Sequence, residues 1–185
     1  MSSNQIKEAV QILQQGGVIA YPTEAVFGLG CDPDNHQAVE KLLAIKQRSR
    51  DKGLILIAAD FQQLRPYLAE IDSSLKAKIL TTWPGPVTWL WPASPTVPSL
   101  LRGKHDTIAV RVTAHTLAAT LCREFGAPLV STSANLSGQP PTRTADEVRS
   151  QLGDQLDYVL EGEIGGLSRP SQIRDAVTGE IIREA

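Results

Sequence analysis

The sequence predicts a single α/β domain built around a twisted mixed sheet flanked by helices. Apolar runs of strand length alternate with segments of helical periodicity along most of the chain. The end of the chain instead holds short apolar segments separated by tight-turn residues, which indicates further strands. A chain of 185 residues fits one domain, residues 1–185, and can bury a core without disulfides or a structural metal.

The elements of the first half follow from these two periodicities. Residues 3–15 place apolar side chains on one helical face, and Gly16-Gly17 ends the pattern where a left-handed cap is favoured. Three more helices should begin behind residues that cap helices well, namely Asn35, Asp60 and Asp72. Short continuous apolar runs predict buried strands at residues 18–21, 54–58 and 87–91.

The second half should contain a long strand, two helices and a strand-rich end. Residues 107–112 form the best strand pattern in the chain, and the helix after them should end at Gly126. A strand at 129–131 leads into a polar loop, and Thr144 with Glu147 forms a capping box for the last helix. The remaining strands are expected at residues 158–160, 173–177 and 180–183.

Composition and charge exclude several classes of protein. The 18 Lys and Arg residues nearly balance 20 Asp and Glu, so the overall field should not drive binding to a polyanion. The longest aliphatic run is far too short to span a membrane, and Cys31 and Cys122 are typical of reduced, packed thiols. The three histidines lack metal-ligand spacing. We therefore expect a soluble cytoplasmic protein with no membrane partner and no protein-held metal.

Two segments could carry chemistry. A basic stretch lies where a helical pattern gives way to a strand, and it suits either a phosphate clamp or a solvated helix end. Its cations are Lys41, Lys46, Arg48, Arg50 and Lys52. Residues 131–138 are rich in hydroxyl and amide groups, which suit either a nucleotide site at a strand end or a simple turn. The known glycine-rich phosphate loops are not found in this sequence.

Five segments spaced along the chain form a specific combination of motifs. They are Tyr21-Pro22-Thr23-Glu24-Ala25-Val26-Phe27-Gly28-Leu29-Gly30, Lys46-x-Arg48, Trp83-Pro84-Gly85-Pro86-Val87-Thr88, Ala109-Val110-Arg111 and Ser133-Ala134-Asn135-x-Ser137-Gly138. In sequence and order they resemble the YrdC/TsaC family of threonylcarbamoyl-AMP synthases, and the resemblance extends over nearly the whole chain. Its short length is similar to the bacterial single-domain type.

The resemblance implies a large, concave, positively lined cavity in the sheet, and it favours the phosphate-clamp interpretation. It implies that L-threonine, bicarbonate or CO2, and ATP condense to threonylcarbamoyl-AMP and pyrophosphate. The product would feed threonylcarbamoyladenosine formation at position 37 of tRNAs that read ANN codons, through transfer proteins of the TsaB/TsaD/TsaE type. Mg2+ should arrive with ATP, and no other cofactor is implied.

Site residues carried over by resemblance fall into two groups. Arg111 suits the threonine carboxylate, and hydroxyl groups suit the threonine side chain. The implied threonine site comprises Thr23, Arg111, Ser131 and Ser171. The implied ATP site comprises Lys46, Arg48, Lys52, Thr107, Ser133, Asn135, Pro141 and Arg183. Lys46 and Arg48 are the expected catalytic residues, stabilising charge on the phosphates, with Ser133 and Asn135 opposite them.

Three positions depart from the family pattern. Ser49 replaces a frequent proline, and Ile57 replaces a histidine, so any contact that the histidine makes with threonine must be absent or come from another group. Gln172 follows Ser171 where many relatives have threonine, which weakens the role of Ser171. The tryptophans Trp83, Trp89 and Trp91 are expected in the core and the cavity wall.

Two other functions remain open. The family has been linked to binding of double-stranded RNA or tRNA and to ribosome maturation, and a basic concave surface could bind RNA weakly. A related domain also handles carbamoyl groups within larger hydrogenase-maturation proteins, but this chain lacks their zinc-finger and acylphosphatase-like parts. RNA binding through several phosphates would weaken steeply with salt, whereas a pocket for ATP and threonine would respond much less.

Overall fold

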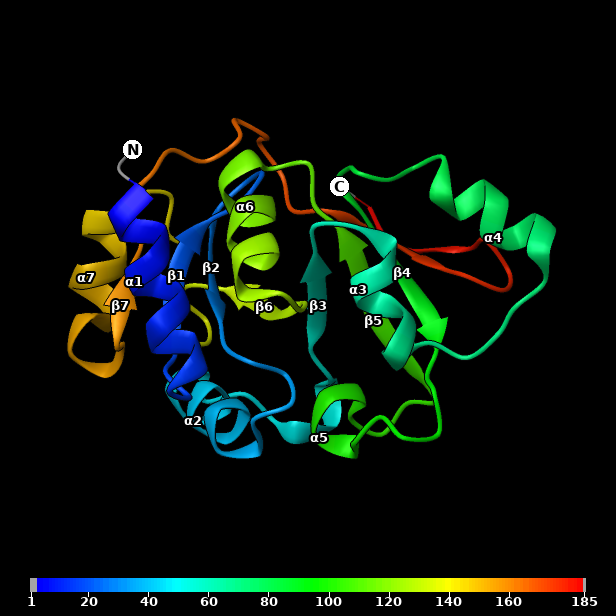
Figure 1. The fold of residues 1–185 in the computed structure, drawn as a ribbon, viewed down its shortest axis with the longest axis horizontal. Helices are drawn as coiled ribbons and strands as arrows, with labels where there is room; N and C mark the ends of the chain where they lie inside the picture. The colour runs from blue at the N-terminus through cyan, green and yellow to red at the C-terminus, as the bar shows by residue number, and fades with distance from the viewer. Residues whose placement is uncertain (1–2, 185) are drawn as a thin grey trace.

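One nine-stranded mixed sheet runs through the molecule (Figure 1), and the computed structural model describes residues 3–184. Its strands lie in the spatial order β7-β1-β2-β6-β3-β5-β4-β8-β9. Their bounds are β1 (Ile19–Pro22), β2 (Phe27–Gly30), β3 (Ile55–Ala58), β4 (Val87–Pro92), β5 (Thr107–Val112), β6 (Leu129–Ser133), β7 (Tyr158–Val159), β8 (Gln172–Asp175) and β9 (Ile181–Arg183). The α/β class expected from the sequence is confirmed.

Helices alternate with these strands, and all of them except α5 lie where the sequence predicted a helix. They are α1 (Ser3–Gln14), α2 (His36–Lys46), α3 (Phe61–Leu64), α4 (Ser73–Leu80), α5 (Ser99–Arg102), α6 (Thr116–Phe125) and α7 (Ala145–Leu152), with 3-10 turns η1 (Arg50–Lys52), η2 (Arg65–Tyr67) and η3 (Gly153–Gln155). The four predicted caps are confirmed, because the side chains of Asn35, Asp60, Asp72 and Thr144 each accept from a backbone N–H in the first turn.

The core consists of one apolar cluster on each face of the sheet. Helices α1 and α6 lie side by side (Figure 1) and pack on strand residues such as Ile19, Ile57 and Leu129. The residues between these on the same strands point to the other face, where α2, α3, α4, α5 and α7 cover them. Helices α1 and α6 cover only part of their face of the sheet, and the pocket described below lies on the remaining part.

Strand β2 was not expected from the sequence, because glycines at alternate positions weaken a strand pattern. The structure shows why glycine is needed there. A Cβ atom on Gly30 would lie 2.6 Å from the Tyr21 ring, so β1 and β2 pair closely only if this position has no side chain. Strand β6 also runs on to Ser133, because Thr132 and Ser133 pair with Leu29 and Gly28.

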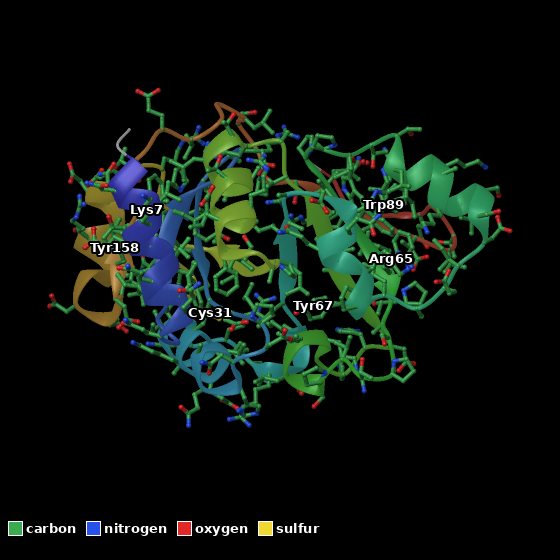
Figure 2. The ribbon with its side chains drawn as sticks, in the orientation of Figure 1. Lys7, Cys31, Arg65, Tyr67, Trp89 and Tyr158 are labelled. Atoms are coloured by element: carbon green, nitrogen blue, oxygen red, sulfur yellow. The ribbon has the colours of Figure 1, made fainter. Side chains whose placement is uncertain are left out.

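Both cysteines are free and buried, as expected, and burial raises the pKa of each thiol. Figure 2 places Cys31 in the interior near β2 and α2. Within residues 3–184, no helix combines the length and apolar composition that a membrane crossing requires. In the same part of the chain, no three His, Cys, Asp or Glu side chains gather as they would around a metal ion.

Candidate active site

A pocket of about 450 Å³ opens on the face of the sheet that α1 and α6 partly cover. Strand register puts its floor residues on that face: Gly28 pairs with Tyr21, and Ile55 pairs with both Ala109 and Ser131. Five basic side chains line it, namely Arg48, Lys52, Arg102, Arg111 and Arg183. Of the described residues lining the pocket, Glu24 alone carries a carboxylate. The pocket is therefore suited to anions.

Strands and loops far apart in the sequence bring most of the expected site residues to this pocket. Those that line it are Thr23, Arg48, Lys52, Thr107, Arg111, Ser131, Ser133, Pro141, Ser171 and Arg183. Lys46 and Asn135 do not line it, but they lie directly behind Ser133. The pocket thus combines both groups of residues in one cavity.

Arg111 lies at one end of the pocket and is 6% exposed. Its Nη1 atom donates to the hydroxyls of Thr88, at 3.3 Å, and Ser171, at 3.0 Å. Its Nη2 atom donates to Glu24 Oε2 at 3.3 Å. The Nε atom is buried and has no hydrogen-bond partner among the described residues. The Nε donor therefore remains unpaired, and a carboxylate bound to both Nε and Nη2 would satisfy it.

Glu24 is held from two sides. Its Oε1 atom accepts from Thr113 Oγ1 at 2.7 Å and from the Ala114 backbone N–H at 3.2 Å. Burial alone would raise the pKa of Glu24, but Arg111 and these hydrogen bonds outweigh it and lower the pKa. Glu24 is consequently a fixed anion and a poor proton acceptor.

Two hydroxyl groups lie beside a glycine on the pocket floor. Thr23 donates through Oγ1 to the Val26 carbonyl at 2.7 Å, which leaves the lone pairs of its oxygen to accept. A Cβ atom on Gly28 would lie 3.3 Å from both Ser131 Oγ and Thr23 Cγ2. The absent side chain at Gly28 thus leaves room between Thr23 and Ser131, where a small polar ligand could contact both.

At the other end, Lys46 is a buried cation held by neutral atoms. Its Nζ donates to the Asn135 carbonyl at 2.6 Å, to Asn135 Oδ1 at 2.9 Å and to Ser133 Oγ at 3.4 Å. Ser133 and Asn135, expected opposite Lys46, are thus its direct partners. Burial and the nearby Arg48 lower the pKa of Lys46 from 10.5 to about 8. An anionic ligand would supply the counter-charge that its neutral partners do not provide.

Arg48 reaches the pocket because the chain reverses just after α2. Gln47, the C-cap of α2, has left-handed backbone geometry with φ of 48°. This turn sends Lys46 toward Asn135 and Arg48 into the pocket, where Arg48 donates through Nε and Nη2 to the Gly53 carbonyl. The guanidinium of Arg48 is thereby fixed, and its Nη1 is left for a ligand oxygen.

Arg183 links the last strand to the Arg111 end of the pocket. It donates to the Ser171 carbonyl at 2.6 Å, while the Ser171 hydroxyl accepts from Arg111. Partial burial and the nearby Arg111 lower the pKa of Arg183. Two guanidinium groups this close together favour an anion between them.

The structure adds residues that sequence reasoning missed and corrects one expectation. Glu24 and Thr88 belong to the sequence motifs named above, but the sequence assigned no role to either. Both accept hydrogen bonds from the Arg111 guanidinium. None of the three tryptophans lines the pocket, so their expected place in the cavity wall is wrong. They pack in or against the core, and Figure 2 shows Trp89 with β4. Ile57 is fully buried and does not line the pocket, so it offers the ligand nothing polar.

A second cavity of about 770 Å³ lies beside the first, between α1, the start of α6 and the loop at residues 163–167. It shares Glu24 and Pro86 with the first pocket, and its walls are largely apolar. Glu24 therefore stands in the partition between the two cavities.

The chain is similar to known proteins in both sequence and fold. The family model described as "Telomere recombination", which covers Sua5, YciO and YrdC, matches residues 11–185. A threonylcarbamoyl-AMP synthase of Photobacterium profundum is 56% identical over 181 residues, covering 97% of this chain and 98% of that protein. A protein with the same name from Coxiella burnetii is 54% identical over 178 residues, covering 96% of each.

Solved structures show the same fold. P. abyssi Sua5 complexed with L-threonine superposes with a TM-score of 0.89 at 31% identity, over 95% of this chain and 52% of that one. This chain thus spans about half of the P. abyssi protein. E. coli YciO superposes with a TM-score of 0.86 at 29% identity, over 99% of this chain and 90% of that one. These matches confirm the resemblance seen in the motifs: the chain belongs to the Sua5/YciO/YrdC family.

Proposed function

We propose that this chain is a threonylcarbamoyl-AMP synthase, which condenses L-threonine, bicarbonate or CO2, and ATP to threonylcarbamoyl-AMP and pyrophosphate. One observation carries the proposal. A single pocket has at one end a buried arginine whose Nε donor is unpaired, and it has further fixed cations along its walls. The full-length relatives that carry this activity in their names support it.

The threonine site is assigned to the Arg111 end. The unpaired Nε of Arg111, with Nη2 beside it, would hold the threonine carboxylate, and Ser171 would fix the guanidinium through Nη1. Thr23 and Ser131 would contact the threonine hydroxyl across the space above Gly28. A site that hydrogen-bonds a substrate hydroxyl rejects analogues that lack it, which would exclude valine.

The ATP site is assigned mainly to the opposite end, and of its residues Arg183 lies near the Arg111 end. Lys46 and Arg48 would stabilise negative charge on the phosphates, since both are buried or half-buried and held in place by neutral oxygens. The remaining residues assigned to the nucleotide are Lys52, Thr107, Ser133, Asn135, Pro141 and Arg183. Mg2+ would enter as part of the nucleotide substrate, so the pocket needs cations and hydroxyls more than carboxylates.

The chemistry demands positioning more than a protein nucleophile. The neutral amine of threonine would attack CO2 and lose a proton to form a carbamate, and a carbamate oxygen would then attack the α-phosphorus while pyrophosphate leaves. The fixed cations would stabilise charge developing on the phosphates. The product, a mixed anhydride, would pass to transfer proteins of the TsaB/TsaD/TsaE type for modification of tRNAs reading ANN codons.

The test is product formation by the purified chain with ATP, Mg2+, L-threonine and 13C-bicarbonate. We expect pyrophosphate release and, by mass spectrometry, threonylcarbamoyl-AMP that carries one 13C atom. Lys46→Ala and Arg111→Ala should lose the product. Lys78→Ala and Arg65→Ala, which remove exposed cations far from the pocket (Arg65 is labelled in Figure 2), should keep it. A folded protein that releases no pyrophosphate would refute the proposal.

A further inference from the structure

We propose that Glu24 and Thr113 are positioning residues for threonine recognition, which hold a fixed counter-charge beside Arg111 and so leave Nε of its guanidinium unpaired for the substrate carboxylate. This inference rests on the proposed function, because it concerns the group assigned to bind L-threonine. Neither residue was assigned a role from the sequence, and both are nearly inaccessible to solvent.

The hydrogen bonds of Glu24 are strongest on the side away from Arg111. Oε1 accepts two of them, from Thr113 Oγ1 at 2.7 Å and from the Ala114 N–H at 3.2 Å. Oε2 makes one longer contact, 3.3 Å, with Arg111 Nη2. The carboxylate is therefore anchored to the segment that leads into α6, and it neutralises Arg111 without a hydrogen bond to Nε.

Thr113 is itself oriented by its neighbour. Its Oγ1 accepts the backbone N–H of His115 at 3.1 Å and donates its own proton to Glu24. Because the hydroxyl accepts on one side, its proton is directed to the other. This arrangement fixes where Oε1 of Glu24 lies, and hence where Oε2 meets the guanidinium.

The geometry requires a carboxylate and not an amide at position 24. The Ala114 and Arg111 N–H groups can only donate. A glutamine would have to turn its NH2 group toward one of them, so one of the two contacts would become donor against donor. Loss of the charge would also leave Arg111, which is 6% exposed, without its only carboxylate among the described lining residues.

Without the hydroxyl of Thr113, Glu24 keeps its charge but loses its shortest anchor. The carboxylate is then free to turn toward the unpaired Nε of Arg111, since a two-point pairing with a guanidinium is more favourable than one long contact. In that position it would compete with the substrate carboxylate. Thr113→Val and Glu24→Gln should therefore have the same effect for different reasons.

The test compares binding of L-threonine with binding of L-threoninamide, which lacks the carboxylate, by calorimetry on the intact protein. The wild-type chain should prefer threonine, and Thr113→Val and Glu24→Gln should each reduce this preference about tenfold. In the assay, KM for threonine should rise about tenfold while KM for ATP stays unchanged. Thr113→Ser restores the hydroxyl and should recover the preference.

Glu163→Gln serves as the matched control for loss of one negative charge. Glu163 is exposed, lines the second cavity, and does not line the pocket that holds Arg111. A lower melting temperature in Thr113→Val and Glu24→Gln with an unchanged threonine preference would mean a purely structural role and would overturn the inference. If Thr113→Val fails to fold, Glu24→Gln carries the same comparison. A wild-type chain that binds no threonine would instead count against the proposed function.

Discussion

Gly28→Ala tests the threonine end of the pocket with the smallest possible change. Gly28 lies in β2, and an added Cβ would lie 3.3 Å from Ser131 Oγ and Thr23 Cγ2 and 3.6 Å from the Thr132 carbonyl. These contacts are slightly shorter than ordinary van der Waals distances, so the two side chains must move by a few tenths of an ångström. The φ angle of Gly28 is outside the left-handed region, so alanine fits the backbone.

The expected effect is selective. A misplacement of 1 Å costs about 100-fold in rate, so a shift of a few tenths should raise KM for threonine about 3- to 10-fold. KM for ATP should stay within twofold, because its assigned cations do not touch the new methyl group. The substitution also stabilises by about 0.4–1 kcal/mol through the unfolded chain, which offsets the crowding and leaves the melting temperature nearly unchanged.

Steady-state kinetics with each substrate varied in turn, together with thermal unfolding, measures both effects. Gly153→Ala is the matched control, since its Cβ would meet only Arg149 Cβ at 3.8 Å, far from the pocket. Gly30→Ala is the opposite control, because its Cβ would lie 2.6 Å from the Tyr21 ring and should destabilise the fold. Equal rises in KM for threonine and ATP, or no rise in either, would refute the assignment of Thr23 and Ser131 to threonine.

Four further predictions concern Arg111, Lys46 and the left-handed residue Gln47. Arg111→Lys keeps the charge but loses the two-point geometry, so KM for threonine should rise about 10- to 100-fold; a rise below threefold would contradict the carboxylate assignment. Lys46 carries its proton below its pKa of about 8, so kcat/KM for ATP should fall as pH rises through 8, whereas Lys46→Arg should keep it constant to pH 9. Lysine in the unfolded chain keeps its proton up to a pKa of 10.5, whereas folded Lys46 loses it near 8. The contribution of Lys46 to the free energy of unfolding should therefore rise as the pH increases from 8 to 10.5. Gln47→Gly removes the Cβ atom from a residue with left-handed backbone geometry. The free energy of unfolding, measured in urea, should rise by up to about 1 kcal/mol, and a decrease would show that φ of 48° stores no strain.

Sequence periodicity predicted the elements that make local, regular patterns. Helices α2, α3, α4 and α7 begin where capping side chains stand, because a cap depends only on residues within one turn. Strand β2 was missed for a physical reason that is not local. Its glycines are unfavourable for an isolated strand, and only the Tyr21 ring on the neighbouring strand shows why Gly30 is required.

The candidate site was predicted where residue type alone indicates a ligand, and missed where it does not. The basic stretch of three lysines and two arginines suited either a phosphate clamp or a solvated helix end, and the motif resemblance favoured the clamp and supplied the hydroxyls. Glu24 carried no such signal, because its contacts lie with Arg111 and Thr113, 87 and 89 positions away. An acidic residue within a positively charged pocket is recognisable as a counter-charge only once the sheet order is known.

Strand β6 shows how the sheet sets the distance between the two proposed substrates. Ser131 and Ser133 are two residues apart, so their side chains project from the same face, about 6.8 Å apart along the strand. Ser131 lies beside Gly28 at the threonine end, and Ser133 accepts from Lys46 at the phosphate end. A carbamate built on threonine must reach the α-phosphorus across this interval. A one-residue slip of β6 against β2 and β3 would turn both hydroxyls to the opposite face, so the paired register of β6 is itself a requirement of the proposed reaction.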